Sequence, residues 1–221
     1  MDKEKIIIAL DVNTIKDLER LLSILSPHVR IFKVGMELFY SCGPKALDVI
    51  RKYDKEIFLD LKFYDIPNTV KNSAKAVTRL GVFMFNVHAS GGGDMMKAAL
   101  EGAGEESEKM GIDRPRILGV TVLTSMEARG EQVLGLAKLA KEAGLDGVVA
   151  SPKEAALIRK EIGKDFLIVT PGVRPEGSEK RDQKRTATPK EAFSAGADYI
   201  VIGRPITKAK DPLKAITSIM Q

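Results

Sequence analysis

The chain has 221 residues, 44% of them hydrophobic, and a formal net charge of +5 at pH 7. This length suits one large hydrophobic core or two small ones, and we expect the simpler arrangement, a single α/β domain over residues 1–221. No segment approaches the roughly 20 consecutive apolar residues of a membrane span, and the charged N-terminus lacks a signal-peptide core. We therefore expect a cytoplasmic protein with no membrane association.

Residues that bind transition metals are few and widely separated. Cys42 is the single cysteine, and His28 and His88 have no second ligand at a metal-binding spacing. The positive charge is compatible with an anionic ligand, but basic residues alternate with acidic ones. The locally basic stretch 179–185 has no aromatic residues for base stacking. We expect no metal site and no nucleic-acid partner.

Eight short apolar stretches alternate with eight amphipathic stretches along the chain. The predicted strands are 6–12, 31–35, 57–63, 84–89, 117–123, 147–151, 166–170 and 199–203. The predicted helices are 14–25, 44–53, 67–80, 94–110, 131–143, 152–162, 189–195 and 211–220. This alternation predicts parallel strands covered by helices, and eight repeats close naturally into a (β/α)8 TIM barrel. The alternative is a doubly wound open sheet, but no G-x-G-x-x-G follows the first strand.

Polar residues gather where the predicted strands end, at the mouth of such a barrel. In chain order they are Asp11, Lys33, Asp60, Lys62, His88, Thr124, Ser125, Arg174 and Arg204. A solvated outer face would not collect charge at one end of so many apolar strands. We expect the functional site at this mouth, and we interpret His88 as a hydrogen-bonded structural residue beside it.

The third predicted strand leads into the densest group of charges, in the stretch 58–67. In a pleated strand, Asp60 and Lys62 point to the same side, and Asp65 follows just beyond the strand end. Taking these charges out of water is costly unless they pair or meet a ligand. The group is therefore either a structural ion pair or a reaction centre.

The ends of the last two strands are typical of phosphate binding in this fold. Gly172 follows the seventh strand and Gly203 with Arg204 follows the eighth, where main-chain N–H groups and a guanidinium could hold an anion. The polar segment 174–188 is longer than a connection requires and is typical of a lid. Arg174 and Gln183 could reach a ligand from it, although an ordinary surface loop has the same composition.

Several motifs together resemble the orotidine 5'-monophosphate decarboxylase family of the bacterial type, over essentially the whole chain. They are Asp11, FKVG at 32–35, DLKFYDIPNT at 60–69, TPGVR at 170–174, DQ at 182–183 and GRP at 203–205. The resemblance implies a decarboxylase that makes UMP and CO2 from orotidine 5'-monophosphate in the last step of UMP biosynthesis. It also implies a homodimer that uses neither a cofactor nor a metal.

The resemblance further implies roles for the charged residues. Lys62 would protonate carbon 6 of the pyrimidine as CO2 leaves, and Asp60 would lie against the departing carboxylate. Lys33 would hold Asp60 and the ribose, while Asp65 and Thr69 would reach into the partner subunit's site. The implied substrate contacts are Asp11, Lys33, Asp60, Ile66, Thr69, Thr124, Ser125, Pro171, Arg174, Gln183, Gly203 and Arg204.

Two other readings stay open. The magnesium-dependent 3-keto-gulonate-phosphate decarboxylases and hexulose-phosphate synthases share the D-x-K-x-x-D arrangement, but they typically carry an acidic metal ligand where this chain has Lys33. An ammonium there would repel Mg²⁺, which needs oxygen ligands. A phosphate-ligand sensor without catalysis is the second alternative, because a barrel and a phosphate site do not prove turnover.

Overall fold

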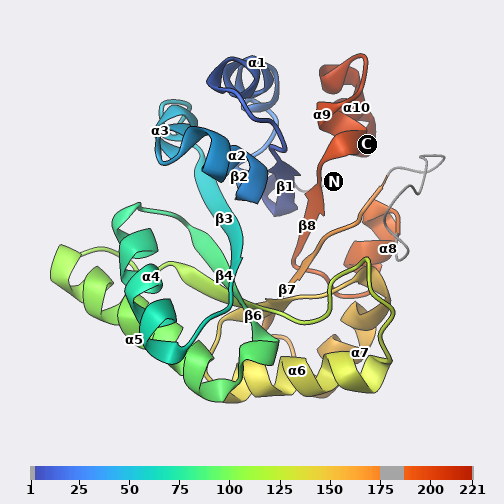
Figure 1. Cartoon of the computed structure of the whole chain (residues 1–221). Coiled ribbons are helices and arrows are strands. Elements are labelled where there is room, and N and C mark those ends of the chain that lie inside the picture. The colour runs from blue at the N-terminus through green and yellow to red at the C-terminus, as the bar shows by residue number, and fades with distance from the viewer. Residues whose placement is uncertain (1–2, 175–186, 221) are drawn as a thin grey trace.

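The computed structural model describes residues 3–174 and 187–220, and its eight parallel strands close into a barrel (Figure 1). The strands are β1 (Ile6–Ala9), β2 (Ile31–Gly35), β3 (Glu56–Phe63), β4 (Met84–His88), β5 (Arg116–Val120), β6 (Gly147–Val149), β7 (Leu167–Thr170) and β8 (Tyr199–Ile202). Each strand pairs with its neighbour in sequence, and β8 pairs with β1. The predicted TIM barrel is confirmed.

The helices surround the strands as an outer layer (Figure 1). Those that match predicted helices are α1 (Ile15–Leu25), α3 (Lys45–Arg51), α4 (Pro67–Arg79), α5 (Gly93–Met110), α6 (Gly130–Glu142), α7 (Pro152–Ile162), α8 (Pro189–Ser194) and α10 (Pro212–Met220). Two short helices, α2 (Met36–Cys42) and α9 (Arg204–Thr207), and two 3-10 turns, η1 (Lys3–Lys5) and η2 (Ala89–Gly91), were not predicted. Neither short helix has a side-chain cap, so the sequence lacks the usual start signal.

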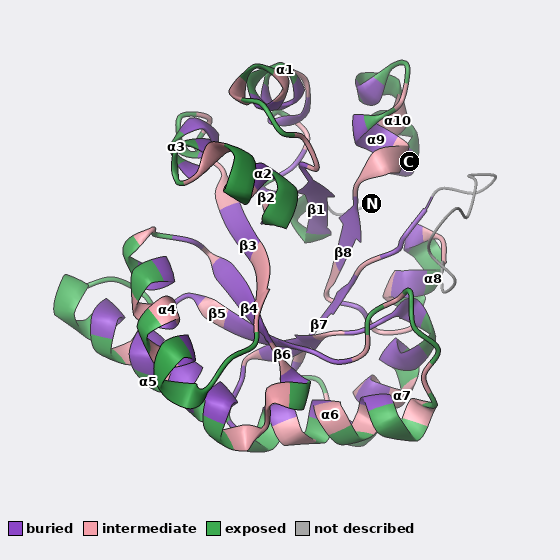
Figure 2. Ribbon diagram, in the orientation of Figure 1, coloured by how far each residue is buried: buried purple, intermediate pink, exposed green. Residues whose placement is uncertain are grey.

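The core has two apolar layers. One lies inside the barrel and includes Ile7, Phe58, Met84 and Val169, and a larger one lies between the strands and the helices. Strands of a parallel barrel are therefore buried on both faces, which explains their nearly continuous apolar sequences. Figure 2 shows buried strands, and helices that are buried on one side and exposed on the other.

Five of the eight strands end earlier than predicted, and β1 and β5 end three residues early, which places functional candidates on loops. β1 ends at Ala9, so Asp11 lies just beyond it, and β5 ends at Val120, so Thr124 lies on the loop that follows. The carboxyl ends of all eight strands nevertheless meet at one end of the barrel, as a closed parallel sheet requires.

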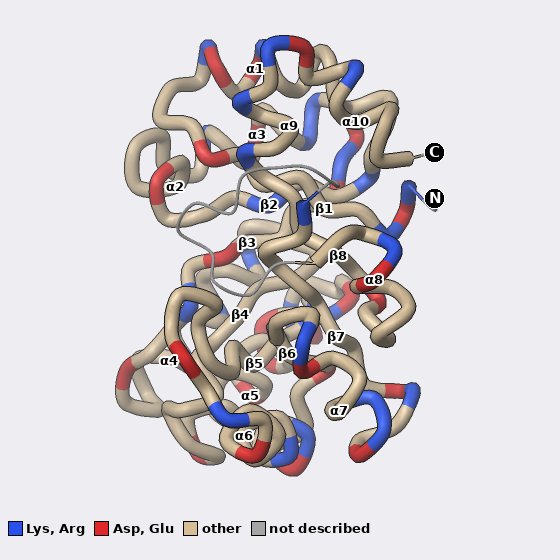
Figure 3. The backbone as a smooth tube through the Cα atoms, turned by 90° about the vertical axis from the view of Figure 1, so that its right-hand side faces the viewer, with Lys and Arg blue, Asp and Glu red and all other residues tan. Residues whose placement is uncertain are grey.

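Charges of both signs are mixed along the outer helices (Figure 3). On α4 and α5 they form ion pairs, with Lys71 and Lys75 reaching Glu105. Within 3–174 and 187–220, no helix combines the length and the apolar character needed to cross a membrane.

Candidate active site

A cavity of about 240 Å³ opens at the carboxyl ends of the strands. Its volume suits a small molecule. The predicted site residues that line it are Asp11, Lys33, Asp60, Lys62, Thr124, Pro171, Arg174, Gly203 and Arg204. The structure thus brings together residues from β1, β2, β3, β5, β7, β8 and the loops after them.

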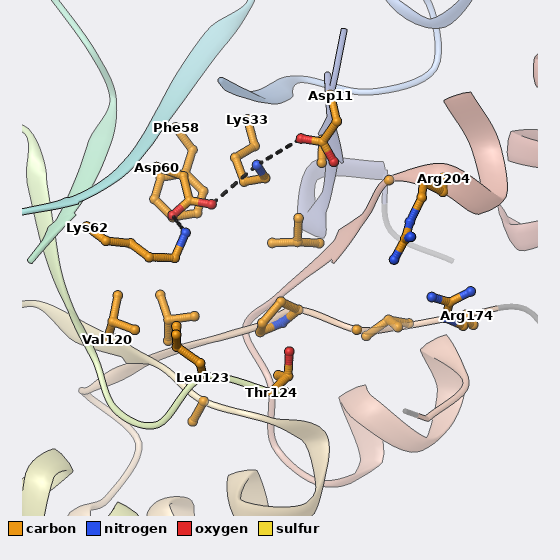
Figure 4. Close-up of a pocket in the computed structure, with 18 of the residues that line it drawn as sticks. Asp11, Lys33, Phe58, Asp60, Lys62, Val120, Leu123, Thr124, Arg174 and Arg204 are labelled. Carbon is orange, nitrogen blue, oxygen red and sulfur yellow. Dashed lines mark hydrogen bonds and ion pairs between the residues drawn. The ribbon is translucent and has the colours of Figure 1, made fainter. Parts of the chain in front are cut away.

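Four of these side chains form a row of alternating charge along one side of the cavity (Figure 4). Lys62 Nζ lies 2.7 Å from Asp60 Oδ1, and Lys33 Nζ lies 3.3 Å from Asp60 Oδ2. Lys33 Nζ also lies 3.4 Å from Asp11 Oδ1. Each oxygen of the Asp60 carboxylate therefore has its own cation, which fixes the carboxylate in both position and orientation.

Burial and pairing act in opposite directions on this row. Burial raises the pKa of Asp60, but Lys33 and Lys62 outweigh it and the net pKa lies below the usual value. Burial lowers the pKa of Lys33, but Asp60 and Asp11 outweigh it and the net pKa is raised. The side chains of Lys33 and Asp60 are only 12% and 13% exposed. Each group therefore stays charged because the opposite charge of the other lies beside it.

The position of the Lys33 side chain also depends on Gly35, two residues further along the same strand. A Cβ at Gly35 would lie 2.9 Å from Lys33 Nζ and 3.6 Å from Asp11 Oδ1. The lysine side chain therefore passes over the main chain of Gly35 in space that a larger residue would occupy.

The third strand is not regular where it carries the charges. From Leu59 to Phe63 it advances four residues, while its partner β4 advances only two, from Phe85 to Val87. Lys62 lies in this bulge with φ 53°, a left-handed conformation that is uncommon outside glycine. Asp60 and Lys62 do share a side, as predicted, but regular strand alternation is not the reason.

One buried residue beside the row was missed from the sequence. Asn86 on β4 is 1% exposed. Its Nδ2 donates to Asp60 Oδ1 at 2.7 Å, and its Oδ1 accepts from the main-chain N–H of Lys62 at 2.8 Å. The available signal was a single amide inside the apolar strand MFNVH, because a buried polar group needs partners.

Two arginines lie at the end of the cavity away from Lys62 (Figure 4). Arg174 follows β7 and is buried, and its main-chain N–H donates to the carbonyl of Ala187 at 2.9 Å. Arg204 begins α9, after Gly203. A Cβ at Gly203 would lie 3.3 Å from the Cβ of Ala9, so the main chain approaches β1 closely there. The paired guanidinium groups suit a dianionic phosphate.

Apolar side chains form much of the remaining wall. Val120, Leu123 and Val201 contribute to it, with Thr124 as a polar group among them. A flat ring with polar edges fits such a surface, because the faces of the ring are apolar while Thr124 can hydrogen-bond an edge.

Some predicted site residues lie outside this cavity. Asp65 and Ile66 are exposed on the segment that joins β3 to α4, and Thr69 is exposed in the first turn of α4. Asp65 Oδ1 accepts a hydrogen bond from the Ile66 N–H at 2.7 Å. Ser125 is exposed and does not line the cavity. Gln183, and the predicted lid 174–188 apart from its ends, lie outside the described residues.

His88 ends β4 near the charged row. Partial burial and the Lys62 ammonium lower the pKa of its imidazole, although Asp60 raises it. The ring of Tyr64 packs edge-on against it with centroids 5.5 Å apart. This packing agrees with a structural residue, but the predicted hydrogen bond of the imidazole is not found within residues 3–174 and 187–220.

Comparisons with known proteins point in one direction. A model of the Orotidine 5'-phosphate decarboxylase / HUMPS family matches residues 4–219. Relatives named orotidine 5'-phosphate decarboxylase include those of Pelobacter propionicus and Trichlorobacter lovleyi, which are 50% and 52% identical. Each alignment covers 99% of this chain and 94% of the relative.

Solved structures agree with the sequence relatives. Orotidine 5'-phosphate decarboxylase from Lactobacillus acidophilus is 44% identical, with a TM-score of 0.85 over 99% of this chain and 98% of its own. An uncharacterized conserved protein from Geobacillus kaustophilus is 40% identical, with a TM-score of 0.83 over 97% of this chain and 98% of its own. The chain therefore belongs to the orotidine 5'-phosphate decarboxylase family.

Proposed function

We propose that this protein decarboxylates orotidine 5'-monophosphate to UMP and CO2, the last step of UMP biosynthesis. The observation that carries the proposal is the Lys62 ammonium, held 2.7 Å from Asp60 within a cavity that has two arginines at its far end. The names of relatives about 50% identical over almost the whole chain support it.

Lys62 is the proposed proton donor. When the bond between carbon 6 of the pyrimidine and the carboxylate breaks, the electron pair of that bond stays on carbon 6. No adjacent group can delocalise this negative charge. A nearby fixed ammonium stabilises this localised charge and then transfers its proton to carbon 6. Buried cavity walls such as Val120 and Val201 strengthen the effect, because charges interact more strongly where water is excluded.

Asp60, Lys33 and Asp11 complete the charged row. Asp60 would lie against the substrate carboxylate and hold Lys62, while Lys33 would hold Asp60 and contact the ribose. Asp11 would bind ribose hydroxyls. The 3.3 Å and 3.4 Å contacts of Lys33 with the two carboxylates support a rigid row that needs no rearrangement during the reaction.

Arg204 and Arg174 would bind the phosphate, and the backbone of Gly203 lies beside them. The phosphate is remote from the bond that breaks, so its binding energy is best used to order the site around the substrate. We include segment 174–188 in this proposal as a lid that brings Gln183 to the ligand. Thr124, Ser125 and Pro171 would contact the pyrimidine side.

A homodimer with shared sites is the proposed assembly. Asp65 and Thr69 are exposed and do not line the cavity of their own chain, and this supports a role in a partner's site. Tyr64 and Ile66 in the same segment are 62% and 67% exposed, an apolar surface that subunit association would cover. Sedimentation velocity measures the assembly directly. A cytoplasmic location is proposed with it.

The magnesium-dependent relatives are the nearest competing reading. Lys33 Nζ lies within 3.4 Å of a carboxylate oxygen of both Asp11 and Asp60. A divalent cation at this place would need the same carboxylate oxygens as its ligands. An ammonium in that place opposes Mg²⁺ binding, so the donor set favours the metal-independent reaction.

One assay tests the proposal and its alternatives. Purified protein is treated with EDTA, and the absorbance of orotidine 5'-monophosphate is followed. We expect substrate loss with UMP as product. Absence of turnover would reject the proposal, and binding of UMP under the same conditions would then favour a sensor. Activity that returns only with Mg²⁺ would favour the metal-dependent relatives.

A further inference from the structure

Asn86 is the buried polar residue whose contacts the proposed reaction does not yet explain. It stands in the middle of β4 between Phe85 and Val87, is 1% exposed, and does not line the cavity. A buried amide without partners costs free energy. Asn86 has partners on both sides of its amide, and both belong to the charged segment of β3.

The main-chain N–H of Lys62 fixes the orientation of the amide. An N–H group can only donate, so the oxygen of Asn86 must face Lys62, at 2.8 Å. The NH2 group then faces Asp60 Oδ1, at 2.7 Å. Turning the amide over would set two donors against each other and an oxygen against a carboxylate. Asn86 is therefore obliged to donate to Asp60.

Asn86 also fills the gap that the bulge leaves in the sheet. Between the pairs Leu59 with Phe85 and Phe63 with Val87, β3 has two more residues than β4. The side-chain oxygen of Asn86 accepts the hydrogen bond of the Lys62 N–H inside this bulge. It thereby supports Lys62 at φ 53°, a conformation that costs free energy for a residue other than glycine.

We infer that Asn86 is a positioning residue for the reaction, which holds the bulged main chain of Lys62 and the carboxylate of Asp60 in one fixed relation. The inference rests on the proposed function. Asn86 acts through the pair and does not touch the cavity, so it should affect the chemical step and not nucleotide binding.

The first test replaces the amide. We expect Asn86→Ala to lower kcat by about 100-fold, since misplacement by about 1 Å costs that much in a preorganised site. Binding of UMP, measured by calorimetry, should change by less than about threefold. Thr78→Val is the matched control, because it removes one buried hydrogen bond, to the carbonyl of Ala74, at the opposite end of α4 from the site. It should leave kcat within about threefold of wild type.

The second test uses Asn86→Asp, which keeps the size and the acceptor for Lys62 but sets a carboxylate oxygen against Asp60. The N–H donated by Asn86 helps to lower the pKa of Asp60, and a carboxylate in its place raises it. The acid limb of kcat/KM should therefore move to higher pH in Asn86→Asp, by less in Asn86→Ala, and not in Thr78→Val. The charged groups that face Asp60 in every variant are Lys33 on β2 and Lys62 on β3, and the titratable imidazole of His88 on β4 lies nearby.

The outcomes separate this inference from the proposed function. If wild-type protein consumes substrate and Asn86→Ala does so at a similar rate, or the acid limb of Asn86→Asp does not move, the positioning role is refuted. If wild-type protein consumes no substrate, the proposed function fails instead. A crystal structure of Asn86→Ala then decides the role of the amide: an unchanged Lys62 φ and an intact ion pair with Asp60 would refute it.

Discussion

Both ends of the barrel carry ion pairs, and the two ends use them differently. At the end where strands begin, Asp146 pairs with Arg114 and accepts a main-chain hydrogen bond from β5. Asp198 pairs with Arg159 and accepts one from β7. Each carboxylate precedes a strand and binds the main chain of the strand before it. These pairs therefore fasten neighbouring strands together.

At the end where strands finish, the charges bind one another and border the cavity. Asp60 contacts Lys33 and Lys62, and it also accepts a hydrogen bond from the Asn86 amide. Charged side chains that hydrogen-bond the main chain contribute to the stability of the fold. A fixed row of charges beside a cavity can instead interact with a bound ligand. Substitutions at each end of the barrel test this division between stabilising charges and functional charges.

The largest effect is expected at Lys62. Lys62→Ala removes both the stabilising charge and the proton, so we expect kcat to fall by at least about 10,000-fold while UMP binding stays measurable. The control is Arg116→Met at the opposite end, where Arg116 stacks on Phe83 and bonds Tyr199. Absorbance kinetics should find it within about threefold of wild type. Near-normal turnover in Lys62→Ala would remove the lysine from its role.

The next largest effect is expected at Arg204. A charge-assisted hydrogen bond contributes about 1.5–3 kcal/mol, so Arg204→Ala should lower kcat/KM for orotidine 5'-monophosphate by about 10- to 150-fold. Truncated substrates without the phosphate should react equally well with the variant and with wild type. Equal losses for both substrates, measured side by side, would contradict the phosphate contact and would place Arg204 with the structural charges.

The same division between the two ends explains which features could be predicted from the sequence. Asp60, Lys62 and Arg204 stood out because charged residues at the ends of apolar strands have no role in a core. The barrel followed from the eightfold alternation, since periodicity and element order depend only on local sequence. These features needed no knowledge of distant contacts.

The role of Asn86, the bulge and α2 could not be predicted, because they depend on contacts that the local sequence does not specify. An amide in a strand is compatible with many environments, and its role depends on how β4 pairs with β3. Lysine has no preference for positive φ, so nothing in the sequence marks the conformation of Lys62. The helix Met36–Cys42 has one buried residue, Leu38, and no side-chain cap, so its apolar periodicity is weak.

A smaller effect, on stability only, is expected at the opposite end of the barrel. Asp198→Ala leaves Arg159 and the N–H of Ile168 without their shared partner. We expect a loss of about 1–3 kcal/mol in the free energy of unfolding, which lowers Tm by about 2–12 °C in a chain of this size. Calorimetry measures the shift. At temperatures where the variant stays folded, kcat/KM should equal that of wild type, and a lower value would break the division between the ends.

The smallest effect is expected on the outside of the barrel, where the ion pairs of Glu105 are partly exposed to water. Hydrogen bonds from Lys71 and Lys75 lower the pKa of Glu105 from 4.5 to about 2. A lowered carboxyl pKa means that the folded state gains stability above pH 4.5 and loses it as the pH falls toward 2. Glu105→Gln should therefore be slightly less stable to urea than wild type near neutral pH. The difference should shrink to nothing in acid and also under high salt, because solvent screens exposed pairs. A difference that persisted in acid would show that Glu105 stabilises α4 against α5 by packing, and not by charge.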